Sequence, residues 1–151
     1  MKNHGFLMRN ALLIISFLFC FSVQSQVVNV KPDARLYQCY SKQYIDNLLK
    51  TNPEQISYLN YFLDNSYYTV NLKDAKKAIE GIDVATLQKT TDKSKFTEVK
   101  YDKSTFNVLL YNFSFGDIPY TYVWKSAGIA LVLRPERHIK EDFNMLKINK
   151  K

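Results

Sequence analysis

Residues 106–133 have the sequence FNVLLYNFSFGDIPYTYVWKSAGIALVL, and this stretch decides the fold that the sequence predicts. Apolar side chains occupy both alternating faces of 106–115, which is typical of a central strand covered on both sides. Two further alternating runs, 120–125 and 129–133, flank the short glycine-containing link 126–128. The pattern therefore predicts a central strand followed by a β-hairpin.

Helical spacing of apolar residues brackets these strands. Asp33 is a good N-cap, and apolar side chains recur every three or four residues after it, which predicts a first helix from Ala34 to about Leu49. Asn52 and Pro53 suit the cap and first position of a second helix over 53–63. Pro135 ends the last strand and opens a third helix over 136–146.

Shorter alternating runs at 67–72, 82–87 and 96–101 predict the remaining strands. Because successive strands on short links pair antiparallel, we expect a meander rather than a parallel sheet. The sequence thus predicts an α+β fold, with an N-terminal helical hairpin and a C-terminal helix packed on an antiparallel β-meander of four to five strands. The domain would span 26–151 and end in a frayed basic tail.

The first 25 residues have the pattern of a secretory signal peptide. They begin with positive charge and no carboxylate, continue with an apolar run at 11–23, and end on Val23 and Ser25 at the positions expected before a cut. The apolar run is shorter than the roughly 20 residues of a membrane span. We expect an exported chain that starts at Gln26, lies in the periplasm, at the outer membrane or outside the cell, and has no transmembrane span.

Two cysteines bear on the same prediction. Cys20 lies inside the leader and would be removed; lipidation there is the alternative, which the bulky Leu18 and Phe19 before it disfavour. Cys39 is then alone in an exported chain, so it is either a buried apolar residue or a thiol for another chain. Its place in an apolar helical pattern favours burial.

The residues that could carry chemistry are few. After the leader the chain has one histidine and one cysteine, too few for an internal structural zinc site, and no nucleotide-binding or hydrolase motif. His138 stands among basic residues, where a solvated histidine is the expected state. We expect no metal, no cofactor and no enzyme; a small hydrolase is the weaker alternative and would use two of four carboxylates, Asp83, Glu98, Asp102 and Asp117.

Tyrosine is the positive anomaly, because all 11 tyrosines follow the leader. Four of them match core periodicity and would roof the core: Tyr37, Tyr40, Tyr44 and Tyr68. Tyr120, Tyr122 and Trp124 share one side of a strand, and two assignments are open for that side. Facing outward, they form a binding stripe; facing inward, they bury Trp124 and leave nothing special.

The formal net charge of the chain is +7. Most of the lysines are interspersed with acidic residues, as on the surfaces of typical soluble proteins. The densest basic cluster, around Arg134 and Arg137, could meet an acidic partner or an anionic membrane surface. Nucleic-acid binding would need a one-sided basic stripe and is not expected. The candidate binding residues are thus Tyr120, Tyr122 and Trp124, with Arg134 and Arg137 at the rim.

The leader ending in Ser25-Gln26, the Lys-, Asn- and Tyr-rich chain after it, and the run YVWKSAGIA at 122–130 resemble small exported proteins of the Bacteroidota. The resemblance implies a cell with two membranes and carries no functional residue. The predicted function is a non-enzymatic accessory protein of the bacterial envelope, which binds an envelope protein of an outer-membrane or secretion complex. The alternative is a soluble module that binds a small ligand or a carbohydrate.

Overall fold

The computed structural model describes residues 30–75, 77–98 and 100–148. Three α-helices and a four-stranded sheet make up this part of the chain, so the predicted α+β class is confirmed. The predicted leader, Cys20 and the last three residues of the basic tail lie outside the described residues. Lys147 belongs to the last helix rather than to a frayed tail.

The sheet is mixed, which corrects the predicted antiparallel meander. Its strands are β1 (Tyr67–Asn71), β2 (Ile82–Asp83), β3 (Tyr120–Trp124) and β4 (Ile129–Leu133), in the order β1-β4-β3-β2. β4 pairs antiparallel with both β1 and β3, whereas β2 runs parallel to β3. β1 and β4 are neighbours although most of the sheet lies between them in sequence, which periodicity cannot predict.

The predicted hairpin is present. β3 and β4 are joined by a short turn in which the Gly128 N–H donates to the Lys125 carbonyl at 3.1 Å. Gly128 has a φ of 70°, in the left-handed region where glycine carries no Cβ penalty. The glycine in this link is therefore required by the turn.

The first predicted helix is divided in two. A 3-10 helix, η1 (Ala34–Gln38), is capped by Asp33 as predicted, but the α-helix α2 (Lys42–Thr51) begins only after a second cap at Ser41. Ser41 accepts a hydrogen bond from the Tyr44 N–H at 3.2 Å, which starts the new helix. The N-cap at Ser41 divides the helix, but the spacing of the apolar residues continues across it. The apolar spacing therefore did not reveal the break.

The other helices follow the prediction closely. α3 (Pro53–Asn65) has Asn52 as its N-cap and proline in its first turn. α4 (Glu136–Ile148) begins directly after Pro135 and is slightly longer than predicted.

The predicted central strand at 106–115 is wrong. This segment contains a 3-10 turn, η3 (Val108–Leu110), and only Tyr111 makes an isolated bridge, to Lys89. The described residues of 96–101 form no strand either, and 82–87 is β2 followed by a second 3-10 turn, η2 (Val84–Thr86). Apolar side chains on both faces of 106–115 arise because the segment covers the sheet instead of joining it.

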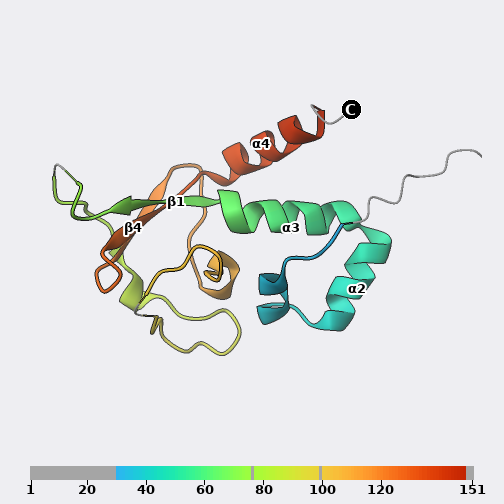
Figure 1. Ribbon diagram of the computed structural model, residues 1–151, viewed down its shortest axis with the longest axis horizontal. Helices are drawn as coiled ribbons and strands as arrows, with labels where there is room; N and C mark the ends of the chain where they lie inside the picture. Colours follow the sequence, from blue (N-terminus) through green and yellow to red (C-terminus); the bar gives the residue numbers. More distant parts are fainter. Residues whose placement is uncertain (1–29, 76, 99, 149–151) are drawn as a thin grey trace, which may run out of the picture.

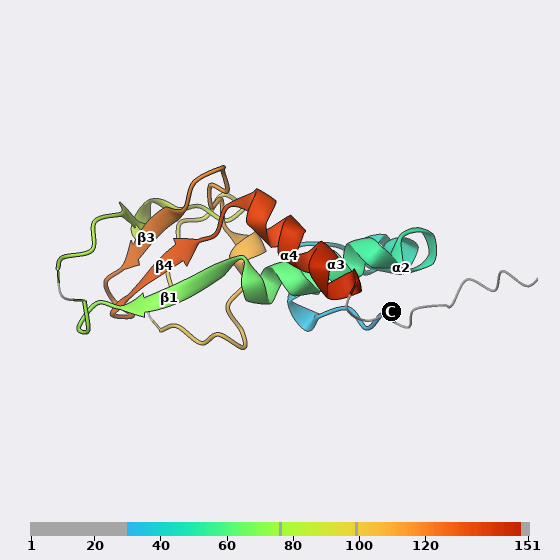
Figure 2. The ribbon, with the colours of Figure 1, turned by 90° about the horizontal axis from the view of Figure 1, so that it is seen from above.

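The helices do not form a layer over the sheet, which is a second correction. Figures 1 and 2 show the strands toward one end of the long axis and α2 and α3 toward the other, with α3 leading almost straight into β1. One sheet face is covered instead by the irregular segment 96–115, and one continuous hydrophobic core runs from this face to α3. The surface between α3 and α4 is left without a sheet against it.

Candidate functional site

Tyr120, Tyr122 and Trp124 share one face of β3, as predicted, and that face is turned to the core. Trp124 is 0% exposed, Tyr122 is also buried, and Tyr120 is half-buried. Of the two assignments that the sequence left open, the structure shows the inward one, so these residues form no outward aromatic stripe. Val123, on the opposite face, is buried as well, so this strand is central.

The aromatic cover over Trp124 explains its burial. Phe96 meets the indole edge-on at a centroid distance of 4.8 Å, and Phe106 lies 5.7 Å from it. The indole Nε1 donates to the Glu98 carbonyl at 3.1 Å and to the Ser126 hydroxyl at 2.9 Å, so its polar edge is satisfied inside the protein. The density of phenylalanine and tyrosine over 96–115 was the available sequence signal.

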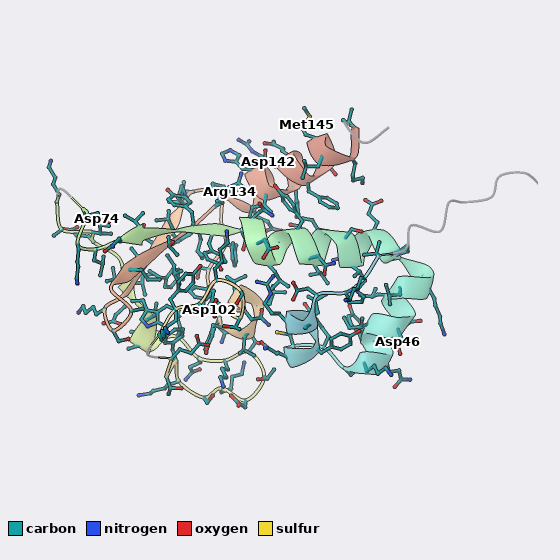
Figure 3. The ribbon with its side chains drawn as sticks, viewed as in Figure 1. Asp46, Asp74, Asp102, Arg134, Asp142 and Met145 are labelled. Carbon is teal, nitrogen blue, oxygen red and sulfur yellow. The ribbon has the colours of Figure 1, made fainter. Side chains whose placement is uncertain are left out.

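The two arginines predicted at the rim lie at the start of α4. Arg134 pairs with Asp142, as Figure 3 shows, and donates to the Asn65 carbonyl at 3.0 Å, which attaches α4 to the end of α3. Arg137 is exposed and pairs with Glu141 at 3.5 Å. Because Tyr122 and Trp124 are buried, the predicted surface of three aromatic residues with the two arginines at its rim is not formed.

Three of the four candidate carboxylates make local structural contacts. Asp83 caps η2 and faces Lys125, Glu98 accepts a hydrogen bond from the Tyr111 hydroxyl at 2.6 Å, and Asp102 caps a turn. Asp117 is exposed, as is His138. Within the described residues no group of three or more acidic, histidine or cysteine side chains is arranged to hold a metal ion.

Three of the four tyrosines that were expected to roof the core are largely exposed: Tyr37, Tyr44 and Tyr68. Tyr40 is half-buried and stacks on Tyr44, with ring centroids 5.4 Å apart. Cys39 is half-buried, and its sulfur accepts a hydrogen bond from the Asn107 amide at 3.4 Å.

A groove of about 580 Å³ lies between the first turns of α3 and the last turns of α4. The segment that enters the fold at Val30 and Lys31 forms its third side. α3 contributes side chains at helical spacing, so one stripe of that helix faces the groove. The lining residues are Val30, Lys31, Pro53, Glu54, Ser57, Asn60, Tyr61, Phe143, Leu146 and Lys147.

The apolar wall of the groove is built on Phe143. Its ring lies 5.3 Å from that of Tyr58 in an edge-on contact and 5.5 Å from that of Tyr61. One turn further, Leu146 is 45% exposed, whereas Ile139, one turn earlier, is fully buried. The apolar stripe of α4 therefore leaves the core at Phe143 and continues as an exposed surface at Leu146.

Polar contacts fix the entering segment of the groove and span its mouth. Asn60 donates to the Lys31 carbonyl at 2.8 Å and accepts from the Asp33 N–H at 2.9 Å, which fixes the entering segment against α3. At the mouth, Lys147 pairs with Glu54 and lies 5.5 Å from the Phe143 ring. Lys31 is exposed and has no ion pair among the described residues.

Comparisons of the chain with protein-family models, curated proteins and solved structures found no match. Among the described residues, no helix has the length and apolar character that a membrane crossing requires. The groove is therefore described by its own chemistry. It has an apolar wall between two helices, Lys31 on one side, which is unpaired among the described residues, and an ion pair at its mouth.

Proposed function

We propose that this chain is an exported, non-enzymatic interaction protein of a bacterial cell envelope. Its groove between α3 and α4 would hold an amphipathic segment of another envelope protein. The site is no longer the predicted stripe on β3, because that stripe is buried. Phe143 and Leu146 would be the apolar contacts, with Lys31 at the rim.

The observation that carries this proposal is the open end of the α4 stripe. Leu146 is exposed at the groove although the same stripe is core one helical turn before Phe143. A groove between two helices with an apolar floor suits the apolar face of a partner helix. The free Lys31 and the positive net charge favour a partner segment with acidic residues beside its apolar ones.

Export rests on the first 25 residues, whose charge and hydropathy pattern supports cleavage before Gln26. The N-terminal mass of the protein recovered from an envelope fraction tests this part. A start at Gln26 supports it, and a cytosolic protein that still begins at Met1 contradicts it.

Site-directed photo-crosslinking in the cell of origin tests the groove. A photoreactive amino acid replaces Ser57, which lines the groove, is half-buried and is not one of the proposed contacts. We expect one discrete adduct with an envelope protein. Adding Leu146→Asp should reduce the yield about tenfold, because a buried apolar contact then becomes an unpaired charge.

The matched control is Met145→Asp. Met145 is an exposed apolar residue on the same helix, points away from α3 in Figure 3, and does not line the groove. Its substitution should leave the adduct unchanged. An adduct that both substitutions weaken equally, or no adduct at all, would contradict the proposed site.

A carbohydrate-binding function is a second candidate, and the Tyr40–Tyr44 stack favours it. Tyr44 is 47% exposed, and an exposed tyrosine ring suits stacking against a sugar. Glycan-array binding that is lost with Tyr44→Ala and retained with Tyr68→Ala, another exposed tyrosine, would support this function. Equal binding by both variants would remove it.

A further inference from the structure

The two edges of the sheet differ in a way that bears on self-association. β2 forms one edge, has only two residues, and turns at once into η2. β1 forms the other edge with five residues, YYTVN, and contains no charge and no proline. Natural proteins usually protect a sheet edge with short strands, lysine, proline or a bulge, and only the β2 edge is protected in this way.

The hydrogen-bond pattern shows which backbone groups of β1 are free. Arg134 N donates to the Ser66 carbonyl at 2.8 Å, and Leu72 N donates to the Gly128 carbonyl at 2.9 Å. Bonded pairs alternate along an antiparallel ladder, so Tyr68 and Val70 direct their backbone groups to β4. Thr69, between them, therefore directs its N–H and C=O away from the sheet.

The free edge is open to solvent at its centre. Thr69 is exposed, and among the described residues no hydrogen bond outside the strand ladders involves its N–H or C=O. Tyr68 is 55% exposed on the sheet face opposite to Tyr67, and Val70 beside it is half-buried. Figure 2 shows β1 at the border of the sheet, with β4 on its inner side.

We propose that two copies of this chain associate through their β1 strands, antiparallel and in register about Thr69. In this register Thr69 pairs with Thr69 of the other copy, and Tyr67 pairs with Asn71. Tyr68 then lies opposite Val70 in a non-hydrogen-bonded pair, where side chains approach most closely. Aromatic–β-branched and Thr–Thr pairs are favourable cross-strand pairs, so β1 is complementary to itself.

The assembly closes after two copies. A two-fold pairing uses the same edge from each copy, and the remaining outer edges are the two-residue β2 strands, which offer little backbone to a third copy. A pair of five-residue strands is small beside a standard interface of roughly 1,600 Å². We therefore expect a weak dimer that forms in the micromolar range or above.

Sedimentation velocity of the purified protein over about 5 to about 500 µM tests the association. We expect a concentration-dependent monomer–dimer equilibrium. Thr69→Pro removes an N–H that points outward, so the β4 ladder stays intact while edge pairing is blocked. The dissociation constant should rise at least about tenfold.

Two double variants at the same positions test the register. Tyr68→Lys with Val70→Lys places like charges opposite each other across the two-fold axis and should weaken the dimer at least about tenfold. Tyr68→Lys with Val70→Glu places opposite charges there and should keep the dissociation constant within about threefold of wild type. Both positions are outside the main core, and far-UV circular dichroism verifies the fold of each variant.

Three results would overturn the proposal. The first is a wild-type protein that remains monomeric over the whole concentration range. A protein that stays monomeric but pairs its β1 edge with an added extended peptide counts as the same result. The second is a dimer that Thr69→Pro does not weaken. The third is a pair of double variants that dissociate equally, because the proposed register requires them to differ.

Discussion

At the residue scale, one buried arginine connects parts of the chain that are distant in sequence. Arg35 is 7% exposed and donates to Asp33 and Asp64 at 2.8 and 2.7 Å, and to the Phe106 carbonyl at 3.3 Å. It thereby ties η1 to the end of α3 and to the segment that covers the sheet. Removal of one carboxylate leaves the buried guanidinium with a single ionic partner, and the lost compensation is destabilising.

The pKa of the Asp33 carboxyl is lowered, first by its side-chain hydrogen bonds with Arg35 and also by the backbone N–H of that residue. A carboxyl with a lowered folded-state pKa stabilises the fold fully above its unfolded pKa of about 3.9. That stabilisation is lost as the pH falls through the lower folded-state pKa. The contribution of Asp33 is therefore present at neutral pH and disappears in acid.

Asp33→Asn tests this ionic contribution, because asparagine keeps an oxygen that can cap η1 but replaces the second oxygen, which accepts from Arg35 Nη2, with an uncharged NH2 group. We expect a free energy of unfolding about 1–2 kcal/mol below wild type at pH 7. The difference should shrink between pH 7 and the acid range below the lowered folded-state pKa of Asp33, because the wild-type carboxyl then loses its charge too. Urea unfolding measured between these limits checks it; a difference that does not change with pH would contradict the ionic explanation.

At the element scale, the shortest strand depends on a glycine. A Cβ at Gly81 would lie 2.6 Å from the Thr121 carbonyl oxygen of β3, which is too close for any other residue. β2 begins at the next residue and pairs parallel with β3. The mixed character of the sheet thus rests on this close backbone approach.

Gly81→Ala should push β2 away from β3 and lower the free energy of unfolding by about 1–3 kcal/mol. Gly116→Ala is the control, because a Cβ there first meets a Tyr120 ring carbon, at 3.1 Å, which can shift more easily than backbone. Chemical denaturation of both variants measures the difference. Equal losses would mean that the contact between Gly81 and Thr121 does not determine the cost.

At the scale of the whole molecule, a single hydrophobic core joins the sheet end to the helical end. Trp124 and Leu131 belong to it at one end, and Ile45 and Ile56 belong to it at the other. The irregular segment 96–115 supplies most of the aromatic cover between them. A shared core of this kind predicts that both ends unfold together.

Trp124 is the only tryptophan, so its emission reports on the sheet end alone. We expect blue-shifted emission in the native protein, since the indole is fully buried, and a red shift on unfolding. Far-UV circular dichroism reports mainly the helices, and its unfolding midpoint in urea should coincide with that of the emission. Two separate midpoints would contradict a shared core.

The sequence by itself determined the α+β class, α3 with Pro53 at its start, α4, β1, the β3–β4 hairpin and the capping residues Asp33 and Asn52. These features depend on contacts between residues close in sequence. Caps satisfy backbone groups within one turn, and a glycine with positive φ permits a tight hairpin. The alternation along β3 likewise placed Tyr120, Tyr122 and Trp124 on one face.

Only the tertiary structure decided which side of β3 that face is, because alternation is the same for an inward and an outward stripe. It also made 106–115 a cover rather than a strand, since apolar residues on both faces suit either role. The parallel β2, the open β1 edge and the groove at Leu146 depend on which distant segments meet. Local periodicity shows which apolar side chains share a face. The packing of the whole chain determines whether another part of the protein covers that face.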